Sequence, residues 1–313
     1  MSEKIAVIDI GTNSIKFCIA ANNNGKLKQI EDSILPGRMG ENFRQTGKIS
    51  PSAMNRNIQI LHQLCEQSRR SGVSRIIAIG TMILRSAVNA NIFIQKVKDV
   101  CGIDIQVLSG DEEARLSYLA AISSMNNISG NVCVIDTGGG STELTFGKNQ
   151  HISNSLSFDI GAVILTESFC KHDPVTNQDL HLMWHHIQQT INLHEMKQSV
   201  NVLIGSCGAI TTMAAVKHQI SDYDPEVIHG SILTQKDVLT QINLYASKTI
   251  DQRKRIQGIP SGRADIALAG ACISKYVMEK LQCDQIIVCD RGLRYGVILE
   301  AFSGKQMPKI NAD

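Results

Sequence analysis

Two short segments rich in Gly, Asp and hydroxyl side chains open the two halves of this 313-residue sequence. VIDIGTNS runs from Val7 to Ser14, and VIDTGGGST runs from Val134 to Thr142. Glycine-rich turns let backbone N–H groups converge on an anion, and neighbouring hydroxyls add further donors. A single Asp-X-Gly turn is ordinary, but two at equivalent points indicate an internal duplication suited to binding phosphate.

Neither segment follows the two best-known phosphate-binding patterns. No GxxxxGK[ST] occurs anywhere in the chain, and neither turn is a GxGxxG that opens a helix. Each turn is instead expected to join two strands of a hairpin.

Acidic side chains at the ends of the predicted strands are the candidate metal ligands. Asp9 and Asp136 would face a bound phosphate, and like charges repel unless a cation lies between them. Mg²⁺ is the expected cation because it prefers carboxylate, water and phosphate oxygens. Glu143, seven residues after Asp136, is either a further ligand of the ion or a solvated strand residue.

A third acidic segment, LSGDEEARL, places Asp111, Glu112 and Glu113 between a strand end and a helix start. Acids in a first helical turn complement the helix dipole, so a purely structural role is one interpretation. A carboxylate that projects into a cleft could instead activate water. Arg85, in GTMILRSA, is either a bidentate phosphate ligand or an ordinary surface arginine.

The elements that must position these residues repeat in the two halves. The first half is predicted to contain strands at 5–8, 15–20, 27–35, 75–79 and 104–108, with helices at 51–72, 89–100 and 111–125. The second half restarts with strands at 131–135, 143–146, 152–158, 202–204 and 285–289, with helices at 162–170, 177–196 and 292–301. We therefore predict one lobe at 1–124, a second at 125–302 and a frayed tail at 303–313.

Composition agrees with two cores, and the net charge gives no argument for a nucleic-acid or membrane partner. The chain exceeds the usual size of one hydrophobic core, and 43% of its residues are apolar. Lys and Arg total 31 against 29 Asp and Glu, so nothing in the net charge favours nucleic acid or membrane. Nine cysteines without a CxxC pair suit a reducing compartment, and no signal peptide or spanning segment is evident. We expect a cytoplasmic protein.

Six segments in order, DIGTNS, GTMILRSA, LSGDEEARL, VIDTGGGSTEL, GSCGAI and CDRGLRYGV, give the chain a resemblance to a known family. It resembles the exopolyphosphatase and guanosine pentaphosphate phosphohydrolase family over residues 5–301. That family belongs to the actin, sugar kinase and Hsp70 superfamily. The resemblance implies an α/β fold of two ribonuclease-H-like lobes with mixed sheets, and an active site in the interdomain cleft.

The resemblance also implies a role for each candidate residue. Glu113 would be the general base that deprotonates water, and Arg85 would bind phosphate near the scissile bond. Asp136 and Glu143 would hold Mg²⁺, or another divalent cation such as Mn²⁺. The implied phosphate-binding residues are Asp9, Gly11, Thr12, Asn13, Ser14, Gly138, Gly139, Gly140, Ser141, Thr142, Gly205, Ser206 and Gly208.

The chain departs from its relatives at a few positions. Cys207 and Ala209 stand where relatives often carry Ser and Thr, so the third turn, GSCGA, would offer backbone contacts but fewer hydroxyls. Tyr295 stands where many relatives carry Glu.

Several interpretations remain open at the level of sequence. The expected partner is polyphosphate or a phosphorylated guanosine nucleotide, with no nucleic acid and no membrane, and a homodimer is expected from the family alone. An actin-like kinase or ATPase and a non-catalytic polyphosphate or nucleotide sensor are the alternatives from other classes. His181, His185, His186 and His194 share one predicted helix and could bind a transition metal or lie on the surface.

Overall fold

The computed structural model describes residues 3–23, 26–125, 128–193 and 199–303, which fold into two compact units. Unit 1 comprises Met1–Leu116 and Leu293–Asp313, and unit 2 comprises Ser117–Gly292. The first boundary falls inside helix α5 (Gly110–Ser124). No helix in the described part of the chain is long and apolar enough to cross a membrane.

Unit 1 is built on a five-stranded mixed sheet with the strand order β3-β2-β1-β4-β5. The strands are β1 (Lys4–Ile10), β2 (Ile15–Asn23), β3 (Lys26–Leu35), β4 (Arg75–Gly80) and β5 (Ile105–Val107). β1, β2 and β3 are antiparallel neighbours, whereas β4 runs parallel to both β1 and β5. The predicted hairpin and its third strand are confirmed.

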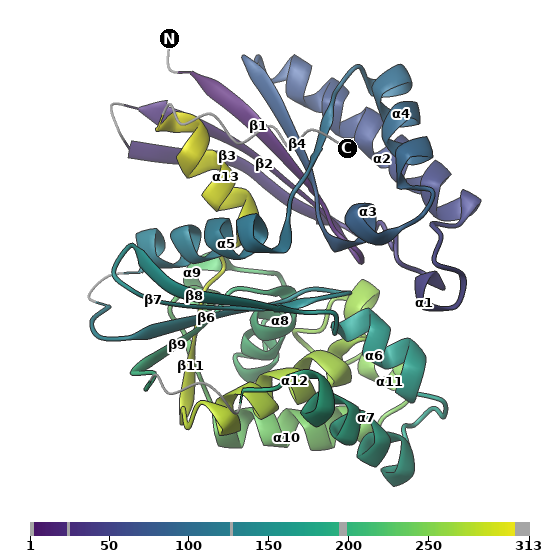
Figure 1. Cartoon of the computed structure of the whole chain (residues 1–313), viewed down its shortest axis with the longest axis vertical. Coiled ribbons are helices and arrows are strands. Elements are labelled where there is room, and N and C mark those ends of the chain that lie inside the picture. Colours follow the sequence, from purple (N-terminus) through teal and green to yellow (C-terminus); the bar gives the residue numbers. More distant parts are fainter. Residues whose placement is uncertain (1–2, 24–25, 126–127, 194–198, 304–313) are drawn as a thin grey trace. The chain divides into compact units, whose positions relative to one another are not determined.

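Helices cover both faces of this sheet (Figure 1). The unit contains α1 (Phe43–Thr46), α2 (Pro51–Arg70), α3 (Met82–Ser86), α4 (Ala90–Cys101) and α13 (Leu293–Phe302), besides the first half of α5. α2 and α4 pack against one face, and α13 packs against the other. Residues 5–10 of β1 are buried, and side chains of β1 lie in the clusters on both faces of the sheet, which explains the apolar run IAVI.

Unit 2 repeats this plan around a six-stranded sheet with the order β10-β11-β9-β6-β7-β8. The strands are β6 (Val132–Thr137), β7 (Thr142–Lys148), β8 (His151–Phe158), β9 (Val202–Gly205), β10 (Ile232–Thr234) and β11 (Gln285–Val288). β6, β7 and β8 are antiparallel, and β9 runs parallel to β6. The arrangement matches that of β1 to β4, so the predicted duplication is confirmed.

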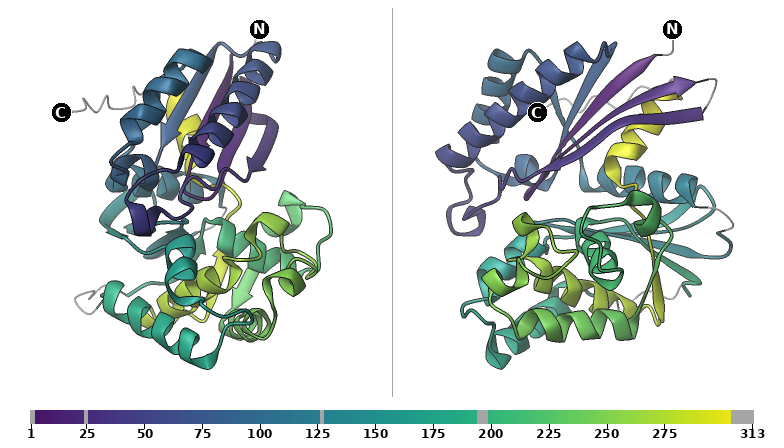
Figure 2. Two further views of the ribbon diagram at one scale, coloured as in Figure 1. Left: turned by 90° about the vertical axis from the view of Figure 1, so that its right-hand side faces the viewer. Right: turned by 180° about the vertical axis from the view of Figure 1, so that it is seen from behind.

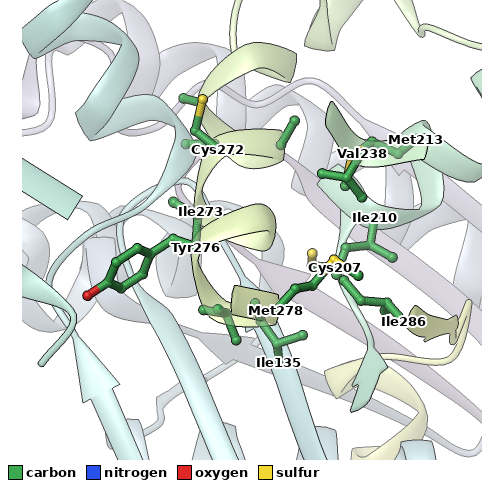
Figure 3. Close-up of a cluster of buried hydrophobic side chains, with 14 of the residues drawn as sticks. Ile135, Cys207, Ile210, Met213, Val238, Cys272, Ile273, Tyr276, Met278 and Ile286 are labelled. Carbon is green, nitrogen blue, oxygen red and sulfur yellow. The ribbon is translucent and has the colours of Figure 1, made fainter. Parts of the chain in front are cut away.

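The helices of unit 2 are more numerous than those of unit 1. They are α6 (Ala162–Phe169), α7 (Asn177–Thr190), α8 (Gly208–Lys217), α9 (Pro225–Ile228), α10 (Gln235–Ala246), α11 (Ile250–Arg253) and α12 (Ala267–Lys280). α12 is buried along most of its length, and Figure 3 shows Cys272, Ile273 and Tyr276 of this helix amid the large apolar core. The opposite face of the sheet carries the second half of α5.

The C-terminal helix marks the main difference from the predicted domain boundaries. We predicted that residues 125–302 form one lobe, whereas α13 belongs to unit 1. Its apolar residues Leu293, Val297 and Ile298 are buried in a cluster with side chains of β1 and β2, and Figure 2 shows this helix, in yellow, along those strands. Amphipathic spacing predicts the helix but not which sheet it covers. Of the predicted tail, residues 304–313 lie outside the described residues.

Candidate active site

The first turn is held by hydrogen bonds that leave its N–H groups available. Gly11 N donates to Ser14 O (3.1 Å), which closes the turn between β1 and β2. The outward carbonyls accept from a neighbouring loop, with Arg38 N 2.8 Å from Asn13 O and Gly40 N 2.9 Å from Thr12 O. Among the described residues, the N–H groups at positions 12–14 donate to no protein group. They form the kind of concave donor array that binds phosphate.

The second turn is closed in the same way but is backed by a helix. Gly138 N donates to Ser141 O (2.9 Å), as Gly11 does to Ser14. Its carbonyls accept from the first turn of α6, through Ala162 N to Gly138 O (3.0 Å) and Val163 N to Gly139 O (2.8 Å). Within the described part of the chain, the N–H groups at positions 139–141 have no protein acceptor. This is a second donor array of the same kind.

Thr142 corrects one detail of the prediction. Its hydroxyl donates to Ile160 O at 2.6 Å, and the residue is fully buried. A hydroxyl has one proton to donate. Thr142 therefore stabilises the turn through its side chain and has no hydroxyl donor left for phosphate.

The second hairpin brings two carboxylates face to face. Asp136 on β6 and Glu143 on β7 are direct cross-strand partners, so their side chains leave the same face of the sheet. Glu143 is only 2% exposed, so its interpretation as a solvated residue is wrong. Asp136 accepts from Ser117 Oγ (2.8 Å) and Glu143 from Ser157 Oγ (3.1 Å). Two buried carboxylates on paired strands repel each other, and a cation between them would offset that repulsion.

The donor set fits Mg²⁺ better than a transition metal. In the described residues no group of three or more His, Cys, Asp or Glu side chains could hold a metal ion. Mg²⁺ is commonly held by one or two carboxylates, with waters and substrate phosphates as the other ligands. Asp136 and Glu143 would supply those two. The histidine alternative gains no support, because His186 packs on Phe169 and His194 lies outside the described residues.

The first hairpin has the opposite charge at the equivalent position. Asp9 on β1 is the cross-strand partner of Lys16 on β2, and Lys16 Nζ lies 3.3 Å from Asp9 Oδ2. The pair lacks hydrogen-bond geometry, so both Asp9 oxygens are without a hydrogen-bond donor among the described residues. Asp9 is 1% exposed. A buried carboxylate in this state is suited to accept from a metal-bound water or a substrate group.

The three acids of LSGDEEARL have three different environments. Glu112 accepts from Ser109 N (3.0 Å), while Glu112 N donates to Ser109 Oγ (3.2 Å), so Glu112 caps α5. Asp111 is exposed. Glu113 Oε2 lies 3.5 Å from Arg85 Nη1, and Arg85 Nη1 also donates to Leu108 O at 2.7 Å. The structural interpretation therefore holds for Glu112, and Glu113 is paired with the predicted phosphate ligand.

The third turn lies at the start of α8. Ser206 N donates to Ile135 O (2.9 Å), and Ser206 Oγ donates to Arg291 O (3.2 Å). Burial, and next the charge of Asp136, raise the pKa of the Cys207 thiol above its ordinary value. Cys207 makes no side-chain capping bond to α8. Gly205 and Gly208 are closely packed, as a Cβ on Gly208 would lie 2.5 Å from Arg263 Cζ.

Sequence reasoning missed two cations and one serine in these sites. Arg263 Nη1 donates to Gly208 O at 2.8 Å, so a guanidinium lies against the third turn. Ser117 was not singled out although it donates to Asp136. Lys16 could have been found, because it follows Asp9 by seven residues just as Glu143 follows Asp136. The signal was the spacing of the repeat rather than the residue type.

Two duplicated lobes, each with a glycine-rich hairpin turn, define the class of actin-like folds. The sequence pattern of the Ppx/GppA phosphatase family matches residues 18–304. A crystal structure of the Aquifex aeolicus member of that family superposes with a TM-score of 0.82 at 32% identity, covering 98% of this chain and 100% of the other. The chain belongs to the Ppx/GppA phosphatase family, whose exopolyphosphatases are hydrolases of phosphoric anhydrides.

Two relatives show how the chain compares with whole proteins. It is 28% identical to exopolyphosphatase 2 of Mycobacterium tuberculosis, over 95% of this chain and 98% of that protein. It is 31% identical to the bifunctional 3-dehydroquinate synthase/phosphatase of Fusobacterium nucleatum, over 96% of this chain. The match spans 47% of the Fusobacterium protein, so the chain is similar to about half of it.

Proposed function

We propose that the protein hydrolyses the terminal phosphoanhydride bond of inorganic polyphosphate and releases orthophosphate. The observation that carries the proposal is the Glu113–Arg85 pair, 3.5 Å apart at the start of α5. A phosphate-binding turn alone serves kinases and chaperones as well as hydrolases. A carboxylate beside a phosphate-binding cation adds what hydrolysis needs, which is a base for water next to the reacting phosphoryl group.

The candidate residues have different roles in the proposed reaction. In unit 1, Glu113 accepts a proton from the attacking water, and Arg85 offsets charge on the phosphoryl oxygens. The water oxygen bonds to the terminal phosphorus, the bridging P–O bond breaks, and the shortened chain leaves with that electron pair. In unit 2, Asp136 and Glu143 would hold Mg²⁺. When bound, the ion offsets negative charge on the phosphate oxygens.

The assignment of polyphosphate rests on what the chain offers and on its relatives. Backbone N–H arrays bind phosphate groups without reading a base or a sugar. The relative from Mycobacterium tuberculosis that matches over its whole length is named an exopolyphosphatase. Both observations favour an inorganic chain of phosphates.

The test measures phosphate release from long-chain polyphosphate, tripolyphosphate, guanosine pentaphosphate and ATP, each with Mg²⁺ or EDTA. We expect the highest kcat/KM on long-chain polyphosphate and no turnover in EDTA. Glu113→Gln should lower kcat by about 10²- to 10⁴-fold, the usual contribution of a general base, with substrate binding retained. Glu112→Gln is the matched control, since it removes a carboxylate one residue away, keeps an oxygen that can accept from Ser109 N, and should leave kcat unchanged.

Three outcomes would contradict the proposal. Undiminished turnover by Glu113→Gln would remove the assigned base. A higher kcat/KM on guanosine pentaphosphate would replace polyphosphate as the substrate. Transfer of phosphate from ATP to a sugar would make the protein a kinase.

A further inference from the structure

The first turn depends on a neighbouring loop, residues 37–41, which we call the brace loop. Arg38 N and Gly40 N donate to the carbonyls of Asn13 and Thr12, at 2.8 and 2.9 Å. These two carbonyls lie in the turn whose N–H groups at 12–14 have no acceptor in the described part of the chain. When the carbonyls of a peptide plane are fixed, the N–H groups of the same planes are fixed too. The brace loop therefore sets the direction of the phosphate donors.

The brace loop is itself held in an unfavourable backbone conformation. Arg38 has a φ of 46°, in the left-handed region that residues other than glycine rarely adopt. Such a residue persists only where its surroundings fix it, and such residues cluster at functional sites. At Gly40 a Cβ would lie 2.2 Å from Thr12 Cγ2, so the loop is pressed against the turn.

Two consecutive residues of α2 donate hydrogen bonds to backbone carbonyls of the brace loop. Arg56 Nε donates to Gly37 O (2.8 Å), and Arg56 Nη2 donates to Arg38 O (3.1 Å). Asn57 is fully buried and its Nδ2 also donates to Gly37 O, at 2.8 Å. Arg56 Nη2 further pairs with Glu41 Oε2 at 3.3 Å. One guanidinium thus contacts three of the five residues of the loop.

We propose that Arg56 is a positioning residue for phosphate binding, acting through the brace loop on the turn at 11–14. This inference rests on the proposed function, because it takes that turn to be a phosphate site. Among the described residues, the hydrogen bonds of Arg56 go to the brace loop and not to the turn itself. Its rigid fork is what allows one side chain to fix two successive carbonyls, and a lysine cannot reproduce that geometry.

Arg69 provides a matched control on the same helix. Its Nη2 donates to Cys101 O (2.6 Å), and its Nη1 pairs with Glu66 Oε1 (2.7 Å). Arg69 therefore resembles Arg56 in holding a backbone carbonyl and a glutamate. It differs in lying at the other end of α2, and in the described part of the chain its hydrogen bonds go to Glu66 and Cys101 and not to the brace loop.

The experiment measures binding of inorganic tripolyphosphate by calorimetry in a Glu113→Gln background, so that no hydrolysis intervenes. Arg56→Gln should raise Kd by about tenfold, the effect expected when hydrogen bonds to a charged ligand are misdirected. Arg69→Gln should leave Kd unchanged, although both variants lower the melting temperature. Arg56→Lys should give an intermediate Kd. In the active enzyme, Arg56→Gln should raise KM for polyphosphate more than it lowers kcat.

A second variant alters the contact between the brace loop and the turn directly. Gly40→Ala pushes a methyl group onto Thr12 without touching α2, and it should raise Kd as Arg56→Gln does. Equal Kd values for Arg56→Gln and Arg69→Gln, or an unaltered Kd in Gly40→Ala if Arg56→Gln does not fold, would overturn the inference. Failure of the parent protein to bind tripolyphosphate would also overturn it. Binding without hydrolysis by the wild type would instead refute only the proposed function.

Discussion

The hairpins β1–β2 and β6–β7 share one backbone plan and differ in charge opposite the aspartate beside the turn. Each turn is closed by the same bond, Gly11 to Ser14 in one and Gly138 to Ser141 in the other. Each first strand ends in a buried aspartate. Opposite that aspartate stands Lys16 in the first hairpin and Glu143 in the second.

This difference shows how duplicated units can acquire separate tasks. In the first hairpin the protein supplies the cation that accompanies the aspartate. In the second it supplies another anion, and Mg²⁺ would offset the charge of the pair in the proposed reaction. In the proposed function, one residue at an equivalent register position thus separates the phosphate-binding turn from the metal site.

Exchanging the charge at this position should have the largest effect. Glu143→Lys would give the second hairpin the charge pattern of the first and replace the cation site by an internal ion pair. The metal would stabilise the charged transition state by several kcal/mol, so its loss should lower kcat/KM by on the order of 10³-fold. Titration of activity with Mg²⁺ checks this result, and added Mg²⁺ should not restore it. Lys148→Ala, at the exposed end of the same strand, is the control. Retention of Mg²⁺-dependent turnover by Glu143→Lys would contradict the assignment of Glu143 as the metal ligand that distinguishes the two hairpins.

The reverse exchange should have a smaller effect. Lys16→Glu would place a second carboxylate opposite Asp9 and repel phosphate from the first turn. We expect KM for polyphosphate to rise by roughly 10- to 100-fold, as for loss of a charge-assisted contact together with a new repulsion. Steady-state kinetics over a range of salt concentrations measures this, and the increase should shrink as salt rises. An unchanged KM would show that Lys16 serves only Asp9.

The packing of α6 against the second turn should contribute to the free energy of unfolding. A Cβ on Gly161 would lie 2.4 Å from the carbonyl carbon of Gly139, so Gly161→Ala must separate α6 from the turn. Overpacking of this kind costs about 1–3 kcal/mol in the free energy of unfolding, which urea denaturation measures. Gly138→Ala is the control, since its nearest contact would be an ordinary 3.5 Å. Equal stability of the two variants would mean that α6 can move away from the turn at little energetic cost.

Much of the fold and part of the site could be predicted because the signals were local. The repeated Asp-X-Gly turns and their flanking apolar runs identified both hairpins, and Ser50 with Pro51 identified the start of α2. LSGDEEARL identified a group of acids but could not divide their roles. That Glu112 caps the helix while Glu113 pairs with Arg85 depends on side-chain positions.

The rest depended on contacts between distant parts of the chain. Arg56 hydrogen-bonds to Gly37 and Arg38, which lie 19 and 18 residues earlier in the chain. Nothing in the spacing of α2 marks Arg56 as different from Arg69. Arg263 is 55 residues from the glycine that it contacts. Helix α13 illustrates the same limit on a larger scale, since an apolar helical face fits either sheet until the packing is known.

The placement of α13 also governs the order in which the parts can fold during synthesis. In the sequence, the residues of unit 2 come between the two segments of unit 1. All of Ser117–Gly292 therefore leaves the ribosome before α13 does. At about 5–20 residues per second, a nascent chain carries the incomplete unit 1 for roughly 10 to 40 seconds after Leu116 is made. During that time Ile5, Val7 and Cys18 lack the helix that buries them. Unit 1 is therefore the first unit to be started and the last to be completed.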